Sequence, residues 1–125
     1  MNIEKQISHW RNGAADNFQF ATECVERGRL PYGLFFAHLA IEKILKAHVI
    51  RETRDYAPKT HNLVRLAELA SIPFAKEQIE FLRDFNVYQL ETRYPEESFP
   101  AIDPATAESD MQSAKEILAW LTKLL

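Results

Sequence analysis

The segment 35–46 reads FFAHLAIEKILK and predicts a helix that is apolar on almost every side. Apolar residues continue to Ile50, so hydrophobic side chains cover the whole helical wheel and not a single stripe. A helix of this kind is stable only when other elements surround it. The rest of the chain therefore has to build a core around this segment.

Charged side chains interrupt this apolar helix along one line. His38, Glu42 and Lys46 follow one another at intervals of four residues, and Lys43 lies beside them. Residues four apart share a helix face, and burying an unpaired charge costs several kcal/mol. The line therefore either closes on itself as a ladder of ion pairs or faces a groove in which a charged ligand binds.

The few glycines and prolines of the chain fall where helices are expected to stop. Gly28 suits a left-handed helix end, Pro31 and Pro104 suit first turns, and Asp103 suits an N-cap. No segment alternates with the period of a strand. The predicted helices are Ile3–Arg27, Pro31–Arg51, Thr60–Ala70 with Thr60 as its cap, Ala75–Glu91, and Pro104 to the end. The fold class predicted is all-α: one domain over residues 1–125, an up-and-down antiparallel four-helix bundle with an additional short helix.

Composition limits the classes of function. A length of 125 residues suits one domain, and a net charge of −3 argues against a general nucleic-acid coat. The stretch from Glu42 to Arg65 is locally basic, with six Lys or Arg against three Asp or Glu. Cys24 is the single cysteine of the sequence, which excludes an internal disulfide, and it is expected to be a small packed side chain. No apolar run is long enough for a membrane span and no signal peptide is present, so a cytoplasmic protein without a membrane partner is expected.

Four kinds of site compete for the polar residues. A metal site on His38 and Glu42 lacks a third ligand, and a nucleophilic enzyme built on Cys24 lacks a partner base, so neither metal nor cofactor is expected. A phosphate or nucleotide site would use the amides that begin the third helix and the basic residues near it. These basic residues are Lys43, Lys46, Arg54, Lys59, His61 and Arg65.

The fourth interpretation is structural. Glu42 and Lys46 form an i, i+4 pair in the favourable order, and Lys43 can pair with acids on neighbouring helices. His9 and His48 belong to no motif and are expected on the surface. The sequence alone leaves the structural and the ligand-binding interpretations both open.

Three short segments, taken in order, resemble a known family. The pattern AxEKxLKA is met by Ala40–Ala47, T-H-x-L by Thr60–Leu63, and RYP by Arg93, Tyr94 and Pro95. The set is similar to the HEPN domain, named for nucleotide binding in higher eukaryotes and prokaryotes, in its small stand-alone prokaryotic form.

The resemblance implies a helical bundle that is commonly dimeric. It also implies a neighbouring minimal nucleotidyltransferase, with which such proteins form a two-gene, toxin–antitoxin-like system. Many relatives are metal-independent ribonucleases that place an Arg-x(4–6)-His motif across a dimer. Here no histidine follows Arg93, whereas Arg54 and His61 have the spacing, with six residues between them, in an unusual place.

We therefore expect a non-enzymatic, nucleotide-binding domain associated with a nucleotidyltransferase and acting as a homodimer. Glu42, Lys43 and Lys46 would line a polar groove, with both lysines on phosphate, and His61 with Arg93 and Tyr94 would close one end. The first alternative is a ribonuclease toxin that uses Arg54 and His61 across a dimer to cleave RNA. The second alternative is a non-catalytic adaptor that binds proteins.

Overall fold

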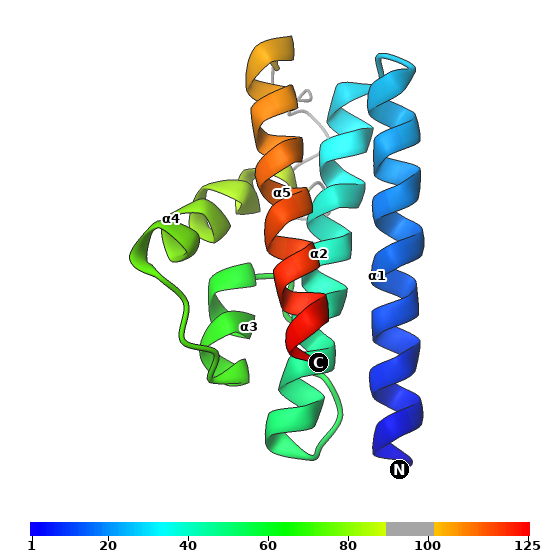
Figure 1. Cartoon of the computed structure of the whole chain (residues 1–125), viewed down its shortest axis with the longest axis vertical. Helices are drawn as coiled ribbons and strands as arrows, with labels where there is room; N and C mark the ends of the chain where they lie inside the picture. The colour runs from blue at the N-terminus through cyan, green and yellow to red at the C-terminus, as the bar shows by residue number, and fades with distance from the viewer. Residues whose placement is uncertain (90–101) are drawn as a thin grey trace.

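The structure, a computed structural model, describes residues 1–89 and 102–125 and consists of helices (Figure 1). The prediction of an all-α fold with five α-helices is confirmed, and the described residues contain no strand. In chain order the elements are α1 (Ile3–Glu26), α2 (Leu30–Thr53), α3 (Leu63–Ala70), α4 (Lys76–Phe85), the 3-10 turn η1 (Asn86–Tyr88) and α5 (Pro104–Leu124).

The first two helices form a tight antiparallel hairpin (Figure 1). Gly28 follows α1 with φ of +76°, the left-handed conformation predicted for it, and the next amide returns to the carbonyl of Cys24 at 2.8 Å. Close to the turn, Gly33 of α2 lies directly against α1. A Cβ at Gly33 would come within 2.5 Å of Val25, so the absence of a side chain permits this close approach.

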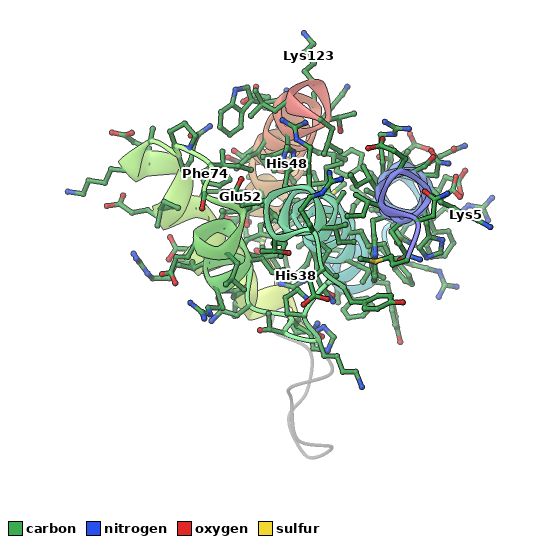
Figure 2. All side chains as sticks on the ribbon, turned by 90° about the horizontal axis from the view of Figure 1, so that it is seen from below. Lys5, His38, His48, Glu52, Phe74 and Lys123 are labelled. Atoms are coloured by element: carbon green, nitrogen blue, oxygen red, sulfur yellow. The ribbon has the colours of Figure 1, made fainter. Side chains whose placement is uncertain are left out.

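Helix α2 is the centre of the molecule. Seen along the bundle, it lies between α1 on one side, α5 on another and α3 on a third (Figure 2). From Ala40 to Ile50 every residue except Lys43 is buried, including Ile41, Ile44 and Leu45 at 0% exposure. The burial predicted from its all-round apolar sequence is confirmed.

Helix α5 runs beside α2 in the same direction. Nε2–H of His48 donates to the carbonyl oxygen of Leu121 at 2.7 Å, and Arg51 donates to that of Leu124 at 2.7 Å. His48 is therefore buried at 5% exposure, and the expectation that it lies on the surface is wrong. His48 and Arg51 are three residues apart, as are their partners Leu121 and Leu124, so the two bonds also set the register of α2 against α5.

The third and fourth helices are shorter than predicted. The N-cap of α3 is Asn62 and not the predicted Thr60, and the helix begins at Leu63. The Asn62 side chain accepts from the amides of Val64 and Arg65. Helix α4 ends at Phe85, because the next residue, Asn86, turns its side chain toward α2 and α3 and the chain tightens into η1. The predicted end at Glu91 lies outside the described residues.

Candidate functional site

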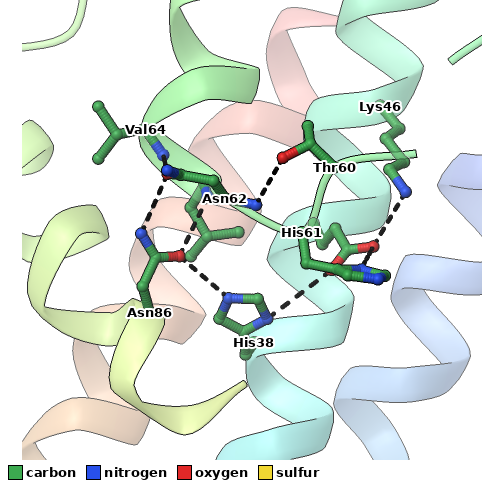
Figure 3. Close-up of polar contacts among 9 residues, drawn as sticks. His38, Lys46, Thr60, His61, Asn62, Val64 and Asn86 are labelled. Carbon is green, nitrogen blue, oxygen red and sulfur yellow. Dashed lines mark hydrogen bonds and ion pairs between the residues drawn. The ribbon is translucent and has the colours of Figure 1, made fainter. Parts of the chain in front are cut away.

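The carboxylate of Glu42 is the centre of a buried polar cluster on α2. Lys46, one turn further along, donates from Nζ to Oε2 at 3.0 Å, and Nδ1–H of His61 lies 3.1 Å from both carboxylate oxygens (Figure 3). Glu42 is 2% exposed and Lys46 is 5% exposed. In this local sense the charged line closes on itself as the ion-pair ladder that the spacing allowed.

His61 lies between the buried carboxylate of Glu42 and the solvent. It comes from the loop between α2 and α3, and its side chain is 39% exposed while that of Glu42 is 3% exposed. Its imidazole therefore covers the carboxylate and separates it from water. Since a carboxylate can only accept, the nitrogen facing it carries a proton, and Glu42 sets both the orientation and the tautomer of this ring.

His38 forms the third side of the cluster. Its Nε2–H donates to Oδ1 of Asn86 at 3.2 Å, and the amide of Leu63 donates to the same oxygen at 3.1 Å, which identifies that atom as the acceptor. Burial lowers the pKa of His38, and this outweighs the Asn86 bond and the charge of Glu42, both of which raise it. His38 is thus neutral at pH 7, with an Nδ1 that is 3.9 Å from Glu42 and has no hydrogen-bond partner among the described residues.

The first amides of α3 are all occupied by side chains or by the helix itself. The Leu63 amide donates to Asn86, the amides of Val64 and Arg65 donate to Oδ1 of Asn62 at 3.0 and 3.3 Å, and the next amide donates to the carbonyl of Asn62. A helix N-terminus binds an anion through amides that lack partners. The α3 amides are therefore not available for the anion site that the sequence suggested.

The two predicted phosphate-binding lysines lie in different surroundings. Lys46 is held by Glu42 and lies over the ring of Trp10, 5.3 Å from its centroid. The side chain of Lys43 lies against α1 instead, where a Cβ at Gly13 would be 3.2 Å from its Cδ. The structure thus brings Lys46 and His61 to Glu42 but directs Lys43 away from them.

The remaining predicted residues are not brought into this cluster. Arg54 ends α2 in the left-handed conformation with φ of 62°, and it is exposed. It lies twelve residues beyond Glu42, which is about 18 Å along the helix, whereas His61 lies on Glu42 itself. Arg93 and Tyr94 lie outside the described residues.

A cavity of about 420 Å³ lies beside the cluster and is lined by hydrogen-bonding side chains. The lining residues are Thr60, His61, Asn62, Asn86 and Gln89. Sequence reasoning missed Asn62 and Asn86 as site residues. Asn62 carried a signal, because Asn before an apolar helical run is a good N-cap. Asn86 carried none, since its partners His38 and Leu63 are 48 and 23 residues away.

Two further findings concern the described residues as a set. They contain no group of three or more His, Cys, Asp or Glu side chains arranged to hold a metal ion. None of the helices among them combines the length and the apolar character that crossing a bilayer requires.

Cys24 is buried at 7% exposure, as expected for a packed side chain.

Comparison with known proteins gives one family and one similar structure. The model of the HEPN domain family matches residues 7–124, nearly the whole chain. The crystal structure of TT1696 from Thermus thermophilus is similar, with a TM-score of 0.74 and 25% sequence identity, over 96% of this chain and 98% of that one. No curated protein matches the chain.

Proposed function

This chain belongs to the HEPN family, and on that premise we propose that it is a non-enzymatic, nucleotide-binding domain. We further propose that it acts as a homodimer beside a minimal nucleotidyltransferase, in a two-gene system of the toxin–antitoxin kind. The ligand site is the Glu42–His61 pair together with the adjoining cavity. Arg93 and Tyr94 remain candidates for the end of the groove, and Lys43 remains a candidate on its α1 side.

The observation that carries the proposal is a polar wall beside a cavity of suitable size. Glu42 holds His61, and His61 with two asparagines and a threonine lines a volume of about 420 Å³. Small-molecule sites usually have about 300–1,000 Å³ and a few fixed polar groups that orient the ligand. Buried ion pairs are weak sources of stability compared with apolar packing, so keeping Glu42 and Lys46 inside the bundle favours a role in a site.

Exposed cations near the cavity supply a place for phosphate. Lys59 directly precedes Thr60, and Arg65 follows Asn62 by three residues; both are exposed. Arg65 pairs with the carboxylate of Glu68 at 3.4 Å, and this surface pair is 58% and 60% exposed. Such a pair is weak enough for a phosphate to replace the carboxylate.

Isothermal titration of the purified protein with ATP, GTP, CTP, UTP and a short RNA tests this proposal. His61→Ala should weaken nucleotide binding by about tenfold or more, equivalent to losing one good hydrogen-bonded contact. The matched control is His9→Ala, because His9 is exposed on α1 and has no place in the cluster. Wild-type protein that binds none of these ligands would refute the proposal, as would equal losses in the two variants.

Association with a partner needs a separate test. Purification of the tagged protein from its native host should recover a small nucleotidyltransferase, and sedimentation should give twice the monomer mass. Recovery of a monomer without a nucleotidyltransferase would refute the assembly part and leave the ligand part to its own titration.

One observation favours a second candidate, a metal-independent ribonuclease. A carboxylate that accepts from Nδ1–H of a histidine fixes the tautomer in which the other ring nitrogen is the basic one, the arrangement used in acid–base catalysis. If this candidate is correct, RNA incubated with the wild type in a chelator is cleaved and His61→Ala abolishes cleavage. Intact RNA after incubation with both proteins would exclude it.

A further inference from the structure

We propose that the cavity lined by Thr60, Asn62 and Asn86 binds an uncharged nucleobase and selects uracil or guanine, which carry a carbonyl where cytosine and adenine carry an amino group. The inference rests on the proposed function and goes beyond it, because it names the part of the nucleotide that is recognised and the base class. It follows from which hydrogen-bonding groups of the cavity wall are already used and which are not.

The two asparagine side chains have defined orientations. Oδ1 of Asn86 accepts from the Leu63 amide, and Oδ1 of Asn62 accepts from the amides of Val64 and Arg65, at 3.0–3.3 Å. Backbone N–H groups can only donate, so in each case the atom facing them is the oxygen. The Nδ2 atom of Asn86 then donates to Oδ1 of Asn62 at 3.2 Å, which locks the two amides together.

The groups of Thr60, Asn62 and Asn86 that remain unused are donors. Both oxygens are occupied, whereas no described residue accepts from Nδ2 of Asn62 or from the second hydrogen of Nδ2 of Asn86. Oγ1 of Thr60 accepts from the Asn62 amide at 3.2 Å, which leaves its hydroxyl hydrogen to donate. A ligand that binds these three residues must present acceptors to them.

The charges around the cavity indicate that those acceptors belong to a base and not to a phosphate. Within the described part of the chain, the lining contains neither Lys nor Arg, the first α3 amides are occupied, and Lys46 is bound to Glu42 behind the wall. Desolvating a phosphate without a cation is costly. Uncharged acceptors are therefore favoured inside the cavity, and the phosphates remain near its exposed edge.

Among the bases, the carbonyl group decides the match. Uracil and guanine present carbonyl oxygens at the position where cytosine and adenine present amino groups. An amino group would face the N–H groups of the asparagines, donor against donor, and leave them without partners. A site built to hydrogen-bond one group rejects the analogue that lacks it.

Two pairs of nucleosides test the inference without the influence of phosphate. Uridine should bind more tightly than cytidine, and inosine more tightly than adenosine, by about tenfold in each pair, as expected for one donor–acceptor mismatch. Within each pair the nucleosides have nearly the same shape and differ in the carbonyl or amino group. Titration calorimetry or saturation-transfer NMR on the full chain gives the affinities.

A single substitution should reverse the preference. Asn62→Asp keeps an oxygen for the two amides and for Asn86, and Asp is as good an N-cap as Asn, but it replaces the outward NH₂ by a carboxylate oxygen. The variant should then bind cytidine more tightly than uridine. The matched control is Asn2→Asp, the same change at the N-cap of α1, where the side chain accepts from the Lys5 amide. This control should keep the wild-type preference.

The outcomes separate the inference from the proposed function. If the members of each pair bind with equal affinity, whether they carry the carbonyl or the amino group, the inference is overturned and the proposed function remains intact. The same holds if Asn62→Asp, folded by circular dichroism, keeps the wild-type preference. A wild type that binds no nucleoside and no nucleotide overturns both.

Discussion

Replacing Glu42 by Gln removes the negative charge of the buried cluster and leaves Lys46 charged inside the bundle. The change conserves the size of the side chain, so packing is little affected. The Lys46 Nζ to Glu42 Oε2 distance is 3.0 Å, and the Lys46 side chain is 7% exposed. We expect Glu42→Gln to be strongly destabilising because the ammonium group of Lys46 would stay buried without a carboxylate partner.

The magnitude follows from the distance and the burial. Two unit charges 3.0 Å apart attract by about 5.5 kcal/mol at an effective dielectric constant of about 20. Part of this is offset because the carboxylate no longer has to be desolvated, and removing one partner of a buried pair costs about 3–5 kcal/mol overall. We therefore expect the free energy of unfolding to fall by about 3 kcal/mol, a large part of the ~5–15 kcal/mol of a typical domain.

Urea unfolding followed by far-ultraviolet circular dichroism measures the change. The matched control is Glu68→Gln, which breaks the exposed pair with Arg65 and should cost less than about 0.5 kcal/mol. The double variant Glu42→Met with Lys46→Met removes both charges and should return to within about 1 kcal/mol of the wild type. The reasoning is refuted if Glu42→Gln costs no more than Glu68→Gln, or if the double variant is no more stable than the single one.

Three further changes test the helix contacts and the buried histidines. Gly33→Ala should cost about 1–3 kcal/mol of unfolding free energy, because the added Cβ would lie 2.5 Å from a side chain and 3.1 Å from a carbonyl of α1. Gly13→Ala should instead stabilise by about 0.5–1 kcal/mol, since its Cβ meets a flexible lysine chain at 3.2 Å and alanine favours the helix; urea unfolding checks both, and a reversed order would contradict the packing argument. Burial lowers the pKa values of His38 and His48 below 6.5, so the unfolded chain takes up protons first and the free energy of unfolding should decrease as the pH falls below about 6.5, by up to ~1.4 kcal/mol per pH unit for each histidine. Unfolding at pH 7.5 and 5.5 measures this, and the double variant His38→Gln with His48→Gln should have a smaller pH dependence; an unchanged dependence would show that other groups cause it.

Much of the fold could be predicted because its signals are local. An all-round apolar segment indicated the central helix, and α2 is that helix. Gly28 and Asp103 indicated a helix end and a helix start, and the structure confirms both roles, with Asp103 accepting from the Thr106 amide at 3.1 Å. The Glu42–Lys46 pair was likewise predictable, since four residues are one helical turn.

The site depended on contacts that no local pattern encodes. His61 reaches Glu42 across 19 residues, and Asn86 reaches His38 across 48. The first contact requires that the loop after α2 folds back onto that helix, and the second requires that α4 packs against it. Neither spacing nor propensity could therefore indicate these contacts. The first α3 amides, predicted as an anion site, are occupied by Asn62, which a local capping pattern indicates, and by Asn86, which only packing brings there.

By itself, the amino-acid sequence determined that this protein is a helical bundle around one apolar helix, and that a line of charges lies on that helix. Periodicity and capping are properties of neighbouring residues, so they can be recognised without knowledge of any tertiary contact. Only the tertiary structure decided that His61 covers Glu42 in the middle of the line and that Asn86 holds His38 at its end. A buried charge is stable only with a partner nearby, and which side chain becomes that partner is settled when distant segments pack together.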